Sequence, residues 1–305
     1  MIDTRELILD GDCPIAVRDY GGTGTPVLFL HGALRNLEDW DAFAERLVED
    51  HRLVAMDFRN HGRSGDGEWT WDAVLDDVDR VIAATGLENP VIVGHSLGGM
   101  VAALYAVRGG RTAGVVNMDG YGGGAPEQYV GMDPDTVVQM QRANFEASLA
   151  SWPDGPVTAE AVAELLSAQV VQGSAYGLPA ARELTGFARG LRDVDGGLVR
   201  HAMSREHLRE LLVGLEDVDW MDLFGRVEAP FLIYRCEGLP GVEGEMRDFM
   251  EAYNAGLRRD LEALDARAGH VEVKFLPDNH GFNLIKPVEL SADIRDFIAS
   301  VHARA

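Results

Sequence analysis

Short apolar runs alternate along this chain with segments of helical periodicity, and this alternation restricts the fold more than any other feature. A segment such as 71–82 has apolar residues at helical three-to-four spacing. Near-continuous Val/Ile/Leu runs separated by helices are typical of a mostly parallel sheet with helices on both faces. Two earlier runs, 5–10 and 14–19, predict an antiparallel lead-in hairpin. The expected parallel strands are 26–31, 52–58, 90–95, 114–119, 230–236 and 271–277.

The alternation stops between residue 120 and about residue 226. That interval contains helical patterns at 135–150, 158–171, 179–191 and 204–214, and no convincing strand. Glycine and proline punctuate both of its ends, as expected for an inserted piece. A loop of this length without structure of its own would be unusual. We therefore expect a core of residues 1–119 and 227–305, with residues 120–226 inserted as a helical cap.

Composition narrows the function classes. The formal net charge of −23 disfavours binding to nucleic acid or to an anionic membrane surface. Cys13 and Cys236 are too few for a disulfide framework, and no apolar run approaches about 18 residues. The N-terminus lacks the apolar stretch of a signal peptide. We expect a cytoplasmic protein, monomeric or homodimeric, whose partner is a small molecule.

The stretch VIVGHSLGGM, residues 91–100, carries the strongest chemical signal. Ser96 lies between a predicted strand and a predicted helix, with Gly94 and Gly98 two positions to either side. A serine nucleophile on a sharp strand-to-helix turn needs such small neighbours, because a Cβ would collide with the tight backbone. The helix that follows points its N-terminal amides at the place where an oxyanion would form.

With this stretch in place, the chain resembles the α/β-hydrolase superfamily, in the esterase, lipase and epoxide-hydrolase style. LFLHG (28–32) is similar to the family's HG motif, and MDFRNHGRSGDG (56–67) to its turn after the fourth strand. The resemblance implies an eight-stranded sheet, and an oxyanion hole formed by the backbone amides of Ala33 and Leu97. Asn60 replaces a usual glycine, and asparagine tolerates a positive φ better than most residues.

His280 is the expected general base. It follows the predicted strand 271–277, at the sheet edge where sites in open parallel sheets form, whereas His270 precedes that strand. It also matches the superfamily's last-strand histidine and comes after Ser96, as the superfamily order requires. His95 is expected to point away from the nucleophile, and His31 to shape the oxyanion loop.

Two carboxylates compete for the third catalytic position. Most members of the superfamily place the acid after the seventh strand, where this chain has Leu239, with Glu237 two residues earlier. A minority layout places it after the sixth strand, and Asp119 ends the run 114–119 there. We favour Asp119 and keep Glu237 as the alternative.

The residues expected around the substrate are mainly aromatic. Ligand sites on such folds are mostly apolar, which favours a hydrophobic acyl or ring-containing substrate. His201, Glu206, His207 and Glu210 have the mixed charge of a solvated helix face, so no metal site is expected. The expected pocket residues are His31, Tyr121, Tyr129, Trp152 and Tyr176.

These residues predict a cofactor-independent serine hydrolase acting on an ester, lactone or thioester of a hydrophobic small molecule. The same scaffold could instead carry out carbon–carbon bond hydrolysis, lyase or cyclase chemistry, or perhydrolysis. A ligand-binding or sensing protein on a hydrolase fold is an alternative of another class.

Overall fold

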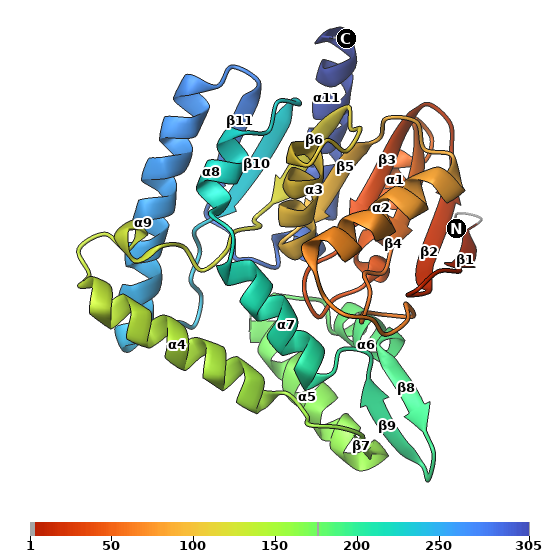
Figure 1. Ribbon diagram of the computed structural model, residues 1–305, viewed down its shortest axis with the longest axis vertical. Coiled ribbons are helices and arrows are strands. Elements are labelled where there is room, and N and C mark those ends of the chain that lie inside the picture. The colour runs from red at the N-terminus through yellow and green to blue at the C-terminus, as the bar shows by residue number, and fades with distance from the viewer. Residues whose placement is uncertain (1–3, 176, 305) are drawn as a thin grey trace.

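The computed structural model describes residues 4–175 and 177–304. Its main sheet has eight strands in the order β1-β2-β4-β3-β5-β6-β10-β11 (Figure 1). The β1–β2 and β2–β4 pairs are antiparallel and the other pairs are parallel. The strands are β1 Arg5–Leu9, β2 Ile15–Gly21, β3 Thr25–Leu30, β4 His51–Met56, β5 Val91–His95, β6 Gly114–Met118, β10 Phe231–Cys236 and β11 Val271–Leu276. The predicted hairpin and parallel sheet are confirmed.

Helices cover both faces of this sheet. Alternate side chains of each central strand enter two separate cores, as in β3, where Leu28 belongs to one and Phe29 to the other. Helices α2, α3, α8 and α9 pack on the first face, and α1 and α11 on the second (Figure 1). Their bounds are α1 Asp41–Leu47, α2 Trp71–Thr85, α3 Leu97–Val107, α8 Trp220–Gly225, α9 Gly244–Arg267 and α11 Pro287–Arg304. Two shorter helices are the 3-10 helix η1 Leu37–Trp40, which precedes α1, and α10 Phe282–Ile285, which precedes α11.

Residues 120–226, which we call the cap segment, pass below the main sheet in Figure 1 and return through α8. They form four further helices as expected, but also a three-stranded antiparallel sheet in the order β7-β9-β8, which the sequence reasoning missed. The elements are η2 Pro126–Gln128, α4 Pro134–Ser151, β7 Val157–Thr158, α5 Ala159–Ala175, α6 Ala180–Arg189, β8 Leu191–Val194, β9 Leu198–His201 and α7 Arg205–Glu216.

The missed hairpin has a recognisable turn. Asp195, Gly196 and Gly197 connect β8 to β9, and both glycines have positive φ (83° and 75°). Such Gly-rich connections between short alternating segments are a hairpin signal. The signal was obscured because strands of four residues, rich in Arg and Asp, show too little hydrophobic alternation.

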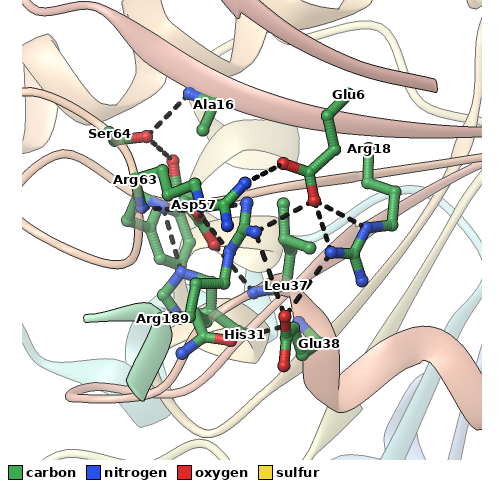
Figure 2. A network of polar contacts seen from close by, with 12 residues as sticks. Glu6, Ala16, Arg18, His31, Leu37, Glu38, Asp57, Arg63, Ser64 and Arg189 are labelled. Carbon is green, nitrogen blue, oxygen red and sulfur yellow. Dashed lines mark hydrogen bonds and ion pairs between the residues drawn. The ribbon is translucent and has the colours of Figure 1, made fainter. Parts of the chain in front are cut away.

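A buried charged network attaches the cap segment to the sheet (Figure 2). Arg189, the last residue of α6, donates from Nε to Oδ2 of Asp57 at 3.0 Å and from Nη1 to Oε1 of Glu6 at 3.0 Å. Asp57 directly follows β4 and also accepts hydrogen bonds from the backbone amides of Leu37 and Arg63. The cap segment is therefore fixed to β1 and to the residue that follows β4 by an arginine with almost no solvent exposure.

Residues 4–175 and 177–304 lack two further features. No helix there is long and apolar enough to cross a membrane. No group of three or more His, Cys, Asp or Glu side chains there is arranged to hold a metal ion.

Candidate active site

Ser96 occupies a strained turn between β5 and α3. Its φ and ψ are 51° and −118°, and its amide donates to the carbonyl of Met118 at 2.9 Å. The two glycines around it are required by close backbone contacts. A Cβ on Gly94 would lie 2.0 Å from the carbonyl carbon of Gly98, and one on Gly98 would lie 2.1 Å from the carbonyl oxygen of Leu30. The geometry is that of a nucleophile elbow, which presents a serine hydroxyl at the carboxyl edge of the sheet.

The structure brings His280 and Asp119 into contact. His280 lies between β11 and α10, and its Nδ1 is 2.7 Å from Oδ2 of Asp119. Asp119 is the first residue after β6 and has a φ of 60°. Because a carboxylate only accepts, Nδ1 of His280 carries the proton, and Nε2 is left as the basic nitrogen. Ser96 and His280 line the same pocket.

Asp119 is held ionised by further donors. Its Oδ1 accepts from the amide of Cys236 at 2.9 Å and from Nη1 of Arg235 at 3.0 Å. Burial alone would raise the pKa of Asp119, but the hydrogen bond to His280 and the charge of Arg235 outweigh it, and the pKa lies below its usual range. The site therefore has a fixed negative charge behind the imidazole.

The alternative acid lies elsewhere. Glu237 accepts from Nε of Arg258 at 2.8 Å and from a second nitrogen of the same guanidinium. Leu239, at the usual position of the superfamily's acid, lies in the wall of the pocket. Of the two carboxylates left open by the sequence, the structure places Asp119 on His280.

The two predicted oxyanion amides belong to a residue of the pocket wall and to the residue that follows Ser96. Ala33 lies in the pocket wall, and Leu97 is the first residue of α3, where helical geometry leaves an amide without an intrahelical acceptor. His31, in the loop after β3 that also carries Ala33, has no solvent exposure. Its Nε2 accepts from the amide of Phe58 at 3.0 Å, so Nδ1 donates to the carbonyl of Gly32 at 2.7 Å. Burial lowers the pKa of His31, and the neutral ring supports the loop.

The pocket has a volume of about 380 Å³ and a mainly apolar wall. One of its residues, Leu178, comes from the cap segment, and four come from the connection between β10 and α9. The lining residues are Gly32, Ala33, Arg35, His95, Ser96, Leu178, Gly238, Leu239, Pro240, Val242, Asn279, His280, Gly281, Asn283 and Leu284.

The expected aromatic lining is wrong for the described residues. Tyr121 donates to the carbonyl of Tyr234 at 2.8 Å, Tyr129 stacks on Tyr253, and Trp152 donates to the carbonyl of Met203 at 2.9 Å. Tyr121 and Tyr129 thus pack the cap segment against the core, whereas Trp152 packs within the cap segment. His31 is likewise absent from the wall, and Tyr176 lies outside the described residues.

His95 was also misjudged, because it lies in the pocket wall rather than away from it. Its Nε2 is 2.9 Å from the carbonyl oxygen of His280, and the two rings are 4.8 Å apart. Burial, together with the neighbouring His280, lowers the pKa of His95 to about 3, so the ring is neutral and Nε2 donates. Asn283, three residues after His280, was missed too. Its only sequence signal is a polar residue within the apolar stretch that follows the base.

Comparison with known proteins agrees with this fold. A family described as alpha/beta hydrolase fold matches residues 25–159. A protein named non-heme haloperoxidase from Rhodococcus erythropolis is 28% identical over 92% of this chain and 94% of its own length. A bifunctional esterase/perhydrolase from Acinetobacter calcoaceticus is 41% identical, but the match spans only 31% of this chain and 36% of that protein.

A solved structure has the same fold over nearly all of this chain. The crystal structure of E-2-(acetamidomethylene)succinate hydrolase matches with a TM-score of 0.71 and 22% identity, covering 98% of this chain and 100% of that one. Together with the sheet order and the family match, this likeness shows that the chain has the α/β-hydrolase fold.

Proposed function

We propose that the protein is a cofactor-independent serine hydrolase that cleaves a carboxylic ester, lactone or thioester through an acyl-enzyme. The observation that carries this proposal is the 2.7 Å contact between His280 and Asp119 in a pocket that also contains Ser96 on its strained turn. A nucleophile, a base and an acid that orients the base are the components of acyl transfer.

The reaction proceeds in two halves. Nε2 of His280 takes the proton of Ser96 as Oγ attacks the acyl carbon, and the amides of Ala33 and Leu97 hold the oxyanion. His280 then returns the proton to the leaving alcohol or thiol, which departs and leaves Ser96 acylated. His280 next deprotonates a water, whose oxygen attacks the acyl carbon, and the acid is released with Ser96 restored. Asp119 stabilises the imidazolium in both halves.

The pocket supports a small, largely apolar substrate. A volume of about 380 Å³ falls in the lower part of the usual range for ligand sites. Leu178, Leu239, Val242 and Leu284 give it apolar walls on several sides. The proposal therefore includes a small-molecule substrate with a short acyl group rather than a long lipid chain.

Replacement of the nucleophile tests the proposal. Ser96→Ala should abolish hydrolysis of short p-nitrophenyl esters while the protein stays folded, because no other group would form the acyl-enzyme. Full activity in Ser96→Ala would refute the serine mechanism. A folded wild-type protein with no activity on esters, lactones or thioesters, but with saturable ligand binding, would favour the ligand-sensing alternative.

Perhydrolysis is a second candidate, favoured by the names of two relatives, a non-heme haloperoxidase and an esterase/perhydrolase. Hydrogen peroxide would replace water in the second half: one of its oxygens attacks the acyl carbon of acylated Ser96, His280 takes the proton, and a peracid leaves. Peracid formation that rises with peroxide concentration and disappears in Ser96→Ala would support it. Hydrolysis that continues unchanged at high peroxide would argue against it.

A further inference from the structure

Asn283 has an unusual environment for a polar side chain. It lies in α10, between the buried Phe282 and Leu284, and has no solvent exposure. Neither its Oδ1 nor its Nδ2 has a hydrogen-bond partner among the described residues. The residue lies in the wall of the pocket that contains Ser96 and His280.

Such an amide is costly to the free protein. A buried donor or acceptor without a partner loses its bonds to water and gains nothing in return. A leucine of similar size would pack between Phe282 and Leu284 without this cost. An unsatisfied polar group beside reacting residues is therefore better explained by a ligand than by packing.

A second unpartnered atom lies in the same wall. His95 donates from Nε2 to the carbonyl of His280, so its Nδ1 is an acceptor, and this nitrogen is buried without a partner among the described residues. Asn283 adds one acceptor and an amide donor. A complementary ligand group must both donate and accept hydrogen bonds.

The charges of the wall favour a neutral group. Arg35 carries a guanidinium into the wall, but it makes two hydrogen bonds to Asp39, at 2.9 and 2.7 Å, and one to Glu183 at 2.8 Å. Two carboxylates therefore compensate this cation. A carboxylate on the substrate would meet the lone pair of His95 without a free cation nearby.

We infer that Asn283 and Nδ1 of His95 form a polar subsite for a neutral hydroxyl or carboxamide group that the substrate carries besides its scissile carbonyl. This inference rests on the proposed hydrolase function and makes Asn283 a specificity-determining residue. The subsite would orient the acyl group in an otherwise apolar pocket.

Matched substrates test the inference. Each set consists of activated esters of one acyl length that carry a methyl, hydroxyl, carboxamide or carboxylate group at the same position of the acyl chain. Further sets place these groups at other positions of the acyl chain. The wild type should prefer the hydroxyl or carboxamide ester over the methyl ester about tenfold or more in kcat/KM, and the carboxylate ester should be poorest. Asn283→Leu should reduce this preference to about twofold or less.

Leu284→Met is the matched control, because it changes a neighbouring side chain of the same wall without adding or removing a hydrogen-bonding amide. It should alter the preference by less than about twofold. The melting temperature of Asn283→Leu should rise, since the unpaired amide is gone. If Asn283→Leu does not fold, Asn283→Ala gives the same substrate readout.

Labelling of Ser96 by a fluorophosphonate probe distinguishes a failure of the proposed hydrolase function from a failure of the proposed subsite. Wild-type protein that is not labelled would contradict the hydrolase function itself. Labelled protein without a polar preference, or with a preference that survives Asn283→Leu, would overturn only the subsite. A fall in the melting temperature of Asn283→Leu would also overturn it, because the amide would then be paired within the protein.

Discussion

Asp119→Asn offers a sharp test of how the site is organised, because the structure determines how the new amide would lie. Asp119 accepts at Oδ1 from two donors, the amide of Cys236 and Nη1 of Arg235, and at Oδ2 from Nδ1 of His280. In the variant, the single amide oxygen should stay on the side of the two donors. The amide nitrogen then faces His280 and donates to Nδ1, which moves the imidazole proton to Nε2.

A protonated Nε2 cannot accept the proton of Ser96. We therefore expect kcat to fall by about 10⁴, which corresponds to about 5.5 kcal/mol in the activation barrier, with little change in KM. Steady-state hydrolysis of a short p-nitrophenyl ester measures the effect, and circular dichroism checks the fold. The check is needed because the variant leaves Arg235 buried without its counter-ion.

Glu237→Gln is the control for this prediction. It breaks a partly exposed ion pair with Arg258 and should change stability by less than about 1 kcal/mol and kcat by less than about twofold. If Glu237→Gln lost activity by orders of magnitude while Asp119→Asn remained active, the assignment of the acid would be wrong.

Three further predictions concern stability and the shape of the site. Gly98→Ala should abolish activity and lower the melting temperature, because its Cβ would lie 2.1 Å from a backbone oxygen of β3; a fully active variant would contradict the tight turn. The pKa of His95 is about 3 in the folded protein and about 6.5 in the unfolded chain. Because the unfolded chain binds the proton more readily, the contribution of His95 to stability is present above pH 6.5 and is lost as the pH falls toward 3. Urea denaturation should show that His95 lowers the free energy of unfolding by about 2 kcal/mol between pH 8 and pH 5, and this contribution should be absent in His95→Gln. An equal decrease in the variant would refute the attribution. Arg189→Met leaves Asp57 buried without its cation and should lower the free energy of unfolding, measured by denaturant titration, by about 3–5 kcal/mol. Arg200→Gln removes an exposed ion pair with Asp66 and should lower it by less than about 1 kcal/mol. Equal decreases in the two variants would argue against a role for burial.

The sequence predicted the main sheet well because its central strands are buried on both faces. All six parallel runs were found within about two residues, since continuous Val/Ile/Leu stretches leave little ambiguity. The turn around Ser96 was readable because its glycines are imposed by backbone contacts, which leave a local trace in the sequence. Asn60 has the positive φ (63°) expected of it.

The pocket wall could not be read in the same way. Its residues come from loops distant in sequence, such as the connection that carries Leu239 and the cap segment residue Leu178. Large aromatic side chains looked suited to a pocket, but Tyr129 stabilises the contact between the cap segment and the core, and Trp152 packs within the cap segment. Periodicity gives the burial of a side chain and does not distinguish a pocket from an interface.

The central claim, a serine nucleophile activated by His280, is tested most directly by covalent labelling. Wild-type protein and the variant His280→Gln are treated with a fluorophosphonate and digested, and mass spectrometry locates the adduct. We predict rapid labelling of Ser96 in the wild type and labelling slower by a factor of at least about 100 in His280→Gln. An adduct on another residue, or equal labelling rates in the two proteins, would contradict the account.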